Sequence, residues 1–104
     1  MTIIRVGNGW HEEFHRFTIA TPAAAGLNQT NQDLDKPGRI KAASASVQAA
    51  TINWNNSQCR IQVTLPAAAN LTYGVYASQV GVAIYQFGAA AQDINVVLWL
   101  VIED

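Results

Sequence analysis

Alternation of apolar and polar residues is the clearest pattern in the second half of the chain. From Gln58 to Leu65 the odd-numbered positions are apolar or small and the even-numbered positions are polar. A period of two is typical of a strand with one buried face, and Pro66 ends this run. Residues 51–54 precede it and lead into the turn-forming cluster Asn55–Ser57. Together the two segments predict a β-hairpin.

The segment Ile94–Glu103 is apolar on both faces, unlike an ordinary strand of a small domain. One face carries Ile94, Val96, Leu98, Leu100 and Ile102, and the other carries Asn95, Val97, Trp99, Val101 and Glu103. Because only one face of a strand meets the core when two sheets pack together, the second face needs a cover of its own. That cover is either the N-terminal segment folded back or a second subunit, where Trp is an enriched anchor. We expect a subunit interface formed by Val97, Trp99, Val101, Trp10 and Phe14.

The remaining strand candidates are less regular. Tyr73–Phe87 predicts one long bent strand, or two short strands with a bulge near Gly81. Ile3–Val6 predicts a short strand followed by a turn at residues 7–9. Arg39–Ala50 predicts a strand of small residues. Residues 10–17 are ambiguous, because the aromatic residues at 10, 14 and 17 share a helical face over barely two turns.

A polar stretch of nineteen residues, Ala20–Gly38, is rich in Asn, Gln, Asp and Pro, and Leu27 and Leu34 are its main apolar anchors. It predicts a long loop, which in a small domain is typical of an arm or a binding segment. The sequence therefore predicts an all-β protein: a single small β-sandwich or jelly-roll-like domain with a long polar loop in its first half. Residues 1–38 would form the N-terminal segment and loop, and residues 39–104 the β-sandwich body.

Charge is scarce and unevenly placed. Charged residues make up 12% of the chain against 50% hydrophobic residues, whereas soluble domains average about 25% charged. Nine of the thirteen charges lie between Arg5 and Lys41, and from Ala42 to Ile102 only Arg60 and Asp93 are charged. Weakly charged surfaces promote association. The body of the protein is thus expected to be covered in an assembly.

Several classes of function find no support in this composition. A net charge of -1 with six scattered basic residues gives no reason to expect nucleic acid or an anionic membrane as a partner. The single cysteine, Cys59, excludes an internal disulfide and is expected to be a small core residue. The N-terminus does not resemble a secretion signal, so we expect the protein to be made in a cytoplasm.

His11-Glu12-Glu13-Phe14-His15 matches the pattern H-E-x-x-H and resembles the zincin metallopeptidase signature. The resemblance implies that His11 and His15 bind zinc from one helix face, with Glu12 as general base. Such a helix would be short, and an aspartate would have to replace the missing third histidine. We therefore expect a polar amphipathic segment with inward aromatic residues, and no catalytic residue, metal or cofactor.

Two further patterns in the sequence bear on possible binding sites. Asn31, Asp33 and Asp35 alternate as in calcium loops, but Lys36 takes the position of the required glycine, so a solvated loop is expected. The aromatic residues at 54, 73, 76 and 85 lie on or beside predicted strands and offer a carbohydrate-stacking surface as an alternative to core packing.

In length, β-rich pattern, low charge, abundance of Ala, Asn and Gln, and apolar last strand before an acidic end, the chain resembles small virion accessory proteins of tailed bacteriophages. The resemblance implies a structural protein of the virion, a capsid decoration or cement protein, made in the host cytoplasm. Its partners would be further copies of itself, for example in a trimer, and a larger capsid or virion protein. The alternatives are a carbohydrate-binding β-sandwich module or phage fibre component, and a small zinc metallopeptidase.

Overall fold

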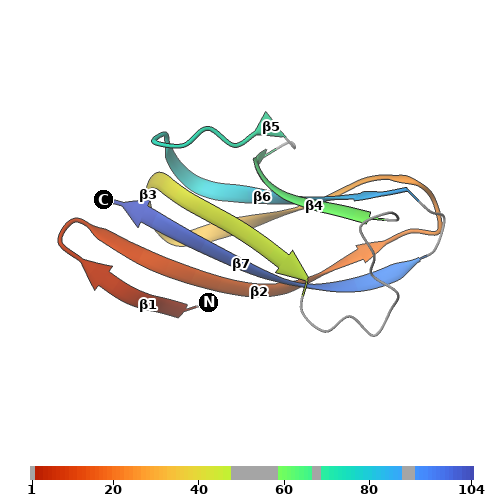
Figure 1. The fold of residues 1–104 in the computed structure, drawn as a ribbon, viewed down its shortest axis with the longest axis horizontal. Coiled ribbons are helices and arrows are strands. Elements are labelled where there is room, and N and C mark those ends of the chain that lie inside the picture. Colours follow the sequence, from red (N-terminus) through yellow and green to blue (C-terminus); the bar gives the residue numbers. More distant parts are fainter. Residues whose placement is uncertain (1, 48–58, 67–68, 88–90) are drawn as a thin grey trace.

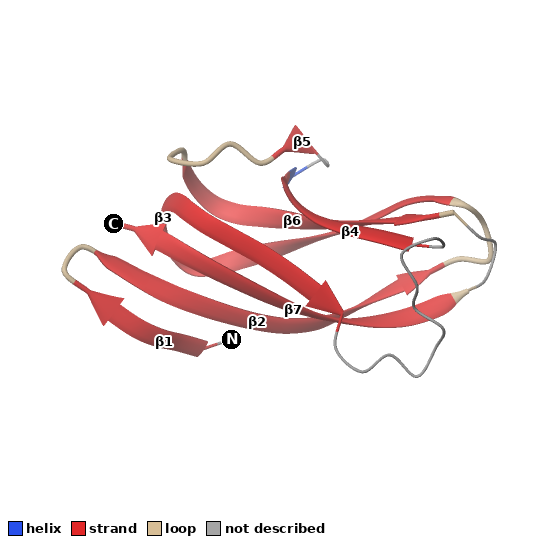
Figure 2. Ribbon diagram, in the orientation of Figure 1, coloured by secondary structure: helices blue, strands red, loops and turns tan. Residues whose placement is uncertain are grey.

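The computed structural model describes residues 2–47, 59–66, 69–87 and 91–104, and these residues form an all-β domain, as predicted (Figure 1). Figure 2 shows an elongated molecule made mostly of long strands, with the described loops at its two ends. The strands are β1 (Thr2–Gly7), β2 (Trp10–Thr21), β3 (Gly26–Val47), β4 (Cys59–Leu65), β5 (Ala69–Asn70), β6 (Tyr76–Gln86) and β7 (Gln92–Glu103).

One continuous antiparallel sheet contains all these strands, in the order β1-β2-β7-β3-β6-β4-β5. The long strand β3 joins its two halves, because residues 26–33 pair with β6 whereas residues 39–47 pair with β7. Between them the register shifts, from Asp33 to Gly38. The sheet bends at this point, which we call the β3 corner. The sandwich or jelly-roll detail of the predicted fold is not confirmed.

A single core lies between the two halves of the bent sheet. Strand β7 contributes its predicted inner face, and β6 contributes Val80, Val82 and Ile84, all of them buried. Ile61 and Val63 of β4 pack against the same cluster, as their alternation predicted. The members of the core are Ile19, Leu34, Ile40, Val80, Val82, Ile84, Ile94, Val96, Leu98, Leu100 and Ile102.

The predicted loop at Ala20–Gly38 is wrong. Strand β2 continues to Thr21 and β3 begins at Gly26, so the connection comprises only residues 22–25. The first part of β3 lacks the alternation of apolar and polar residues that identifies a strand in the sequence. It is the edge strand of the β6 half, and its polar residues face the core side, where they pair with Val80, Val82 and Ile84. These inner residues, Asn28, Thr30 and Gln32, are partly buried. The strands of the first part of the chain, β1, β2 and the first half of β3, therefore belong to the same sheet as the strands that follow.

Two further ambiguities are resolved. Residues 10–17 form a strand, with Trp10 and Phe14 on the outer face and Phe17 packed against the core.

Residues 76–86 form one strand, and its register with both neighbours is continuous at Gly81. A Cβ atom at Gly81 would lie 2.4 Å from Gln29 Nε2 and 2.6 Å from Thr64 Oγ1, so this glycine leaves room for side chains that cross it. The predicted strand at 51–54, its turn, and the side chain of Cys59 lie outside the described part.

Candidate functional site

All five predicted interface residues lie on one face of the β2–β7 pair, opposite the core. Paired residues of antiparallel strands share a face, and Phe14 pairs with Trp99. Val97 pairs with Arg16 and Val101 with Glu12, so these two charged side chains share the face with the apolar ones. Each of the five predicted interface residues is partly buried. We call this surface the outer patch: Trp10, Phe14, Val97, Trp99 and Val101.

The outer patch is bordered by small uncharged side chains on the β3 side. Trp99 pairs with Ser44 and Val97 with Ser46, so small side chains adjoin the patch there. On the β1 side, a Cβ atom at Gly7 would lie 2.0 Å from the Trp10 ring, which shows that the indole rests against the Gly7 backbone. The apolar pair Phe14–Trp99 lies at the centre of the patch, and Glu12 and Arg16 flank it on the same face of β2.

Ion pairs gather at one end of the sheet, beyond the patch. Lys36 Nζ lies 3.2 Å from Asp104 Oδ2, and Glu103 lies 3.8 Å from both Arg39 and Lys41. All five side chains are at least one-third exposed, and such pairs contribute little to stability. These groups provide a charged rim at this end of the molecule.

Other exposed apolar side chains occur at the two ends of β6. Tyr73, Val75 and Tyr76 lie at its start, and the two tyrosines are 57% and 67% exposed. Leu27 and Phe87 lie at the other end, because Leu27 pairs with Tyr85. The aromatic residues considered for sugar stacking are thus divided: Tyr73 and Tyr76 at one end, Tyr85 at the other, and Trp54 outside the described part.

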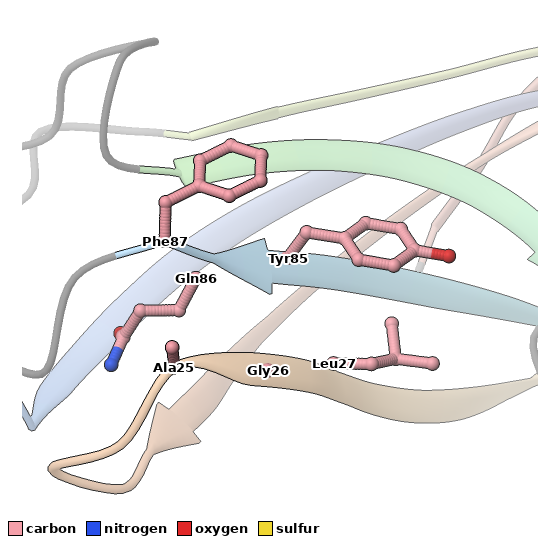
Figure 3. Close-up of a pocket in the computed structure, with 6 residues that line it drawn as sticks. All are labelled: Ala25, Gly26, Leu27, Tyr85, Gln86 and Phe87. Atoms are coloured by element: carbon pink, nitrogen blue, oxygen red, sulfur yellow. The ribbon is translucent and has the colours of Figure 1, made fainter.

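A shallow groove of about 380 Å³ lies at the end of β6, lined by Ala25, Gly26, Leu27, Tyr85, Gln86 and Phe87 (Figure 3). The rings of Tyr85 and Phe87 and the side chain of Leu27 give it an apolar lining. The amide of Gln86 is engaged elsewhere: it donates to the carbonyl oxygens of Pro22 and Ala24 and accepts from Thr21. Gln86 therefore fixes the turn between β2 and β3 and is not available to bind a ligand.

The other candidate site is a buried polar cluster on the inner face of β2. His11, Glu13 and His15 point inwards at alternate positions and are at most 2% exposed. The Nε2 atoms of His11 and His15 lie 2.6 and 2.8 Å from the two carboxylate oxygens of Glu13. Because an ionised carboxylate can only accept hydrogen bonds, each Nε2 carries a proton and donates it. We call these three side chains the Glu13 cluster.

The carboxylate of Glu13 also holds the β3 corner. It accepts hydrogen bonds from the backbone N–H groups of Asp35, at 3.0 Å, and Lys36, at 3.1 Å. These two residues lie within the register shift of β3, where they lack partners in the β6 ladder. Buried backbone groups need a partner, and Glu13 supplies it from a different strand. The cluster thus connects β2 to the bend that joins the two halves of the sheet.

Opposing effects set the pKa of Glu13. Burial acts to raise the pKa, but the hydrogen bonds from Asp35, His11, His15 and Lys36 outweigh it and hold the pKa below the ordinary value of 4.5. The folded state therefore favours the carboxylate. This contribution to stability is fully present above pH 4.5 and is lost as the pH falls through the lower folded pKa.

We accordingly expect the free energy of unfolding to fall more steeply with acidification in the wild type than in Glu13→Gln, which has no titrating group at this position. Urea unfolding at intervals from about pH 6 to about pH 3 measures the difference. The gap between the two stability curves should narrow towards the acid end of this range. Curves that stay parallel throughout would show that Glu13 does not titrate differently in the folded state.

The zincin interpretation fails on geometry. Its signature requires a helix, but residues 10–21 form a strand, which places Glu12 on the face opposite to His11 and His15. The supposed general base is therefore separated from the supposed ligands by the sheet itself. The calcium interpretation fails similarly, because Asn31, Asp33 and Asp35 belong to β3 and not to a loop.

Sequence reasoning missed Glu13, and it considered Asp35 only in other ligand sets, beside Asn31 and Asp33 for calcium and as a possible third ligand to His11 and His15 for zinc. A group of potential metal ligands consists of Glu13, His15 and Asp35, whose ligand atoms all lie within 4.8 Å of one another. Strict alternation along β2 would have placed His11, Glu13 and His15 on one face, but the aromatic spacing favoured a helix. The proximity of Asp35 depends on the β3 corner, which no local pattern predicts.

No family model, curated protein or solved structure matches this chain significantly. Within the described residues, no helix is long and apolar enough to cross a membrane.

Proposed function

We propose that this protein is a structural subunit without catalytic activity, which assembles with further copies of itself through the outer patch. The observation that carries the proposal is the alignment of Phe14 and Trp99 across β2 and β7, on the face that does not meet the core. Aromatic side chains at the centre of an apolar surface are typical anchors of protein interfaces. Burial of this patch in an oligomer would remove it from water.

The exposed apolar residues at the ends of β6 support a second contact, with a larger protein. Tyr73, Val75 and Tyr76 form an exposed group at the start of β6, a strand that takes no part in the β2–β7 pair of the outer patch. A subunit that binds both its own copies and a lattice of a larger capsid protein needs two contact surfaces, and the outer patch and the group at the start of β6 provide them. We therefore propose the role of a virion accessory protein, as a capsid decoration or cement protein, placed in the virion after synthesis in the host cytoplasm.

The test is the mass of the particle in solution, measured by light scattering. Trp99→Asp places a charge at the centre of the outer patch and should reduce the oligomer to the chain mass of 11.2 kDa. Ser44→Glu should do the same without removing any apolar packing, because Ser44 is exposed and pairs with Trp99.

Asn31→Asp is the control for added charge. It introduces the same charge on β3 in the other half of the sheet and keeps the oxygen that accepts a hydrogen bond from Gln29. Its mass should equal that of the wild type. A folded Ser44→Glu variant that retains the wild-type mass would refute the role of the outer patch.

A further inference from the structure

The His15 Nε2 atom and the Glu13 Oε1 atom share a hydrogen bond, and the same two atoms are possible ligands of a metal ion. The His15 Nε2 atom lies 2.8 Å from Glu13 Oε1. Zinc binds imidazole nitrogen and carboxylate oxygen at about 2.0–2.2 Å with tetrahedral angles, so two of its ligand atoms are about 3.4 Å apart. An ion could therefore take the place of this one hydrogen bond if the two ligand atoms move apart by about 0.6 Å.

The tautomer of His15 can change to allow this. The Nδ1 atom of His15 is buried and has no hydrogen-bond partner among the described residues. When Nε2 gives its lone pair to an ion, the proton of the neutral ring moves to Nδ1. No hydrogen bond of Nδ1 has to be broken in this exchange, so the change of tautomer is not opposed by an existing contact.

Asp35 supplies a third ligand and a route for the ion. Its carboxylate belongs to the group of ligand atoms within 4.8 Å, and unlike His15 and Glu13 it is exposed. An ion can thus approach from solvent beside Asp35 and reach the two buried ligands. The two carboxylates balance the charge of a divalent cation, and water can complete its coordination.

The rest of the network would hold the ligands in place. His11 donates to the second oxygen of Glu13, and the Lys36 N–H donates to the same oxygen. Outer partners of this kind orient a ligating carboxylate and strengthen metal binding. All of these contacts are compatible with an ion at Glu13 Oε1.

We propose that His15, Glu13 and Asp35 form a binding site for one divalent transition-metal ion of the zinc type at the β3 corner. This site differs from the zincin pattern, because Glu12 has no part in it and His11 acts through Glu13. It is also independent of the outer patch, which lies on the opposite face of β2. An ion here would fasten β2 to the corner of β3.

Calorimetric titration of the metal-stripped full-length protein with Zn²⁺ tests the proposal, with Co²⁺ and its visible absorption as a spectroscopic probe. We expect one ion per chain. Asp35→Asn should weaken binding at least about tenfold, because it removes one ligand while its backbone N–H still bonds to Glu13. His15→Gln should abolish the Co²⁺ absorption.

Asp33→Asn is the matched control. Asp33 is also exposed, lies two residues away on the same strand, and accepts a hydrogen bond from Gln79 that Asn can still accept. Its affinity for Zn²⁺ should equal that of the wild type. Absence of binding, or equal affinities for Asp35→Asn and Asp33→Asn, would overturn the proposal and leave the cluster a purely structural network. Neither result depends on the oligomeric state of the protein.

Discussion

Replacing Glu13 with alanine should lower the free energy of unfolding by about 3–5 kcal/mol, because four hydrogen-bond donors lose their acceptor and each loss costs about 1 kcal/mol or more. The substitution leaves the N–H groups of Asp35 and Lys36 without an acceptor at the β3 corner, and each unsatisfied buried donor is costly. The histidines on either side lose their acceptor as well. Denaturant unfolding followed by fluorescence measures the loss.

Glu12→Ala is the control for this experiment. Glu12 is the neighbouring residue on the same strand and carries the same side chain, but it points to the outer face beside Val101. Its replacement should cost about 1 kcal/mol or less, as is usual for residues outside the core. If the two alanine variants were equally stable, Glu13 would not hold the corner.

A second large effect is expected in β7, where Leu98→Ala should cost about 2–5 kcal/mol. Leu98 is fully buried at the centre of the core, between the two halves of the bent sheet. Removing most of its side chain leaves a cavity that the surrounding strands cannot fill by small shifts, because their backbones are fixed by pairing on both sides of β7.

Val97→Ala, one residue earlier on the outer face, should cost about 1 kcal/mol or less when measured under conditions in which the protein is a monomer. The contrast between neighbouring positions tests the assignment of the two faces of β7 directly. A loss at Val97 as large as that at Leu98 would mean that the outer patch is packed within the single chain and does not await a partner.

The sequence predicted the fold best where one face of a strand is apolar. The alternation in β4 and the two apolar faces of β7 were read correctly, because burial of one face demands a period of two. The first half of β3 was mistaken for a loop, since the residues that it turns towards the core side, such as Thr30 and Gln32, are polar. An edge strand can tolerate such residues because part of its inner face stays near water.

The candidate sites were predictable to different degrees. The members of the outer patch could be named from β7 and the nearby aromatic residues, although their role in association stays a prediction. The Glu13 cluster was not predicted because its residues match the motif H-E-x-x-H, which assumes a helix. On a helix, Glu13 would lie on a different face from His11 and His15. Its partners Asp35 and Lys36 lie more than twenty residues away, so their contact follows from the bend of β3 and not from any local spacing.

Association through the outer patch is the central claim, and the mass of the wild-type protein tests it most directly. Light scattering over a range of protein concentrations should give a multiple of 11.2 kDa that persists on dilution. A mass of 11.2 kDa at every concentration, including the highest, would contradict the claim.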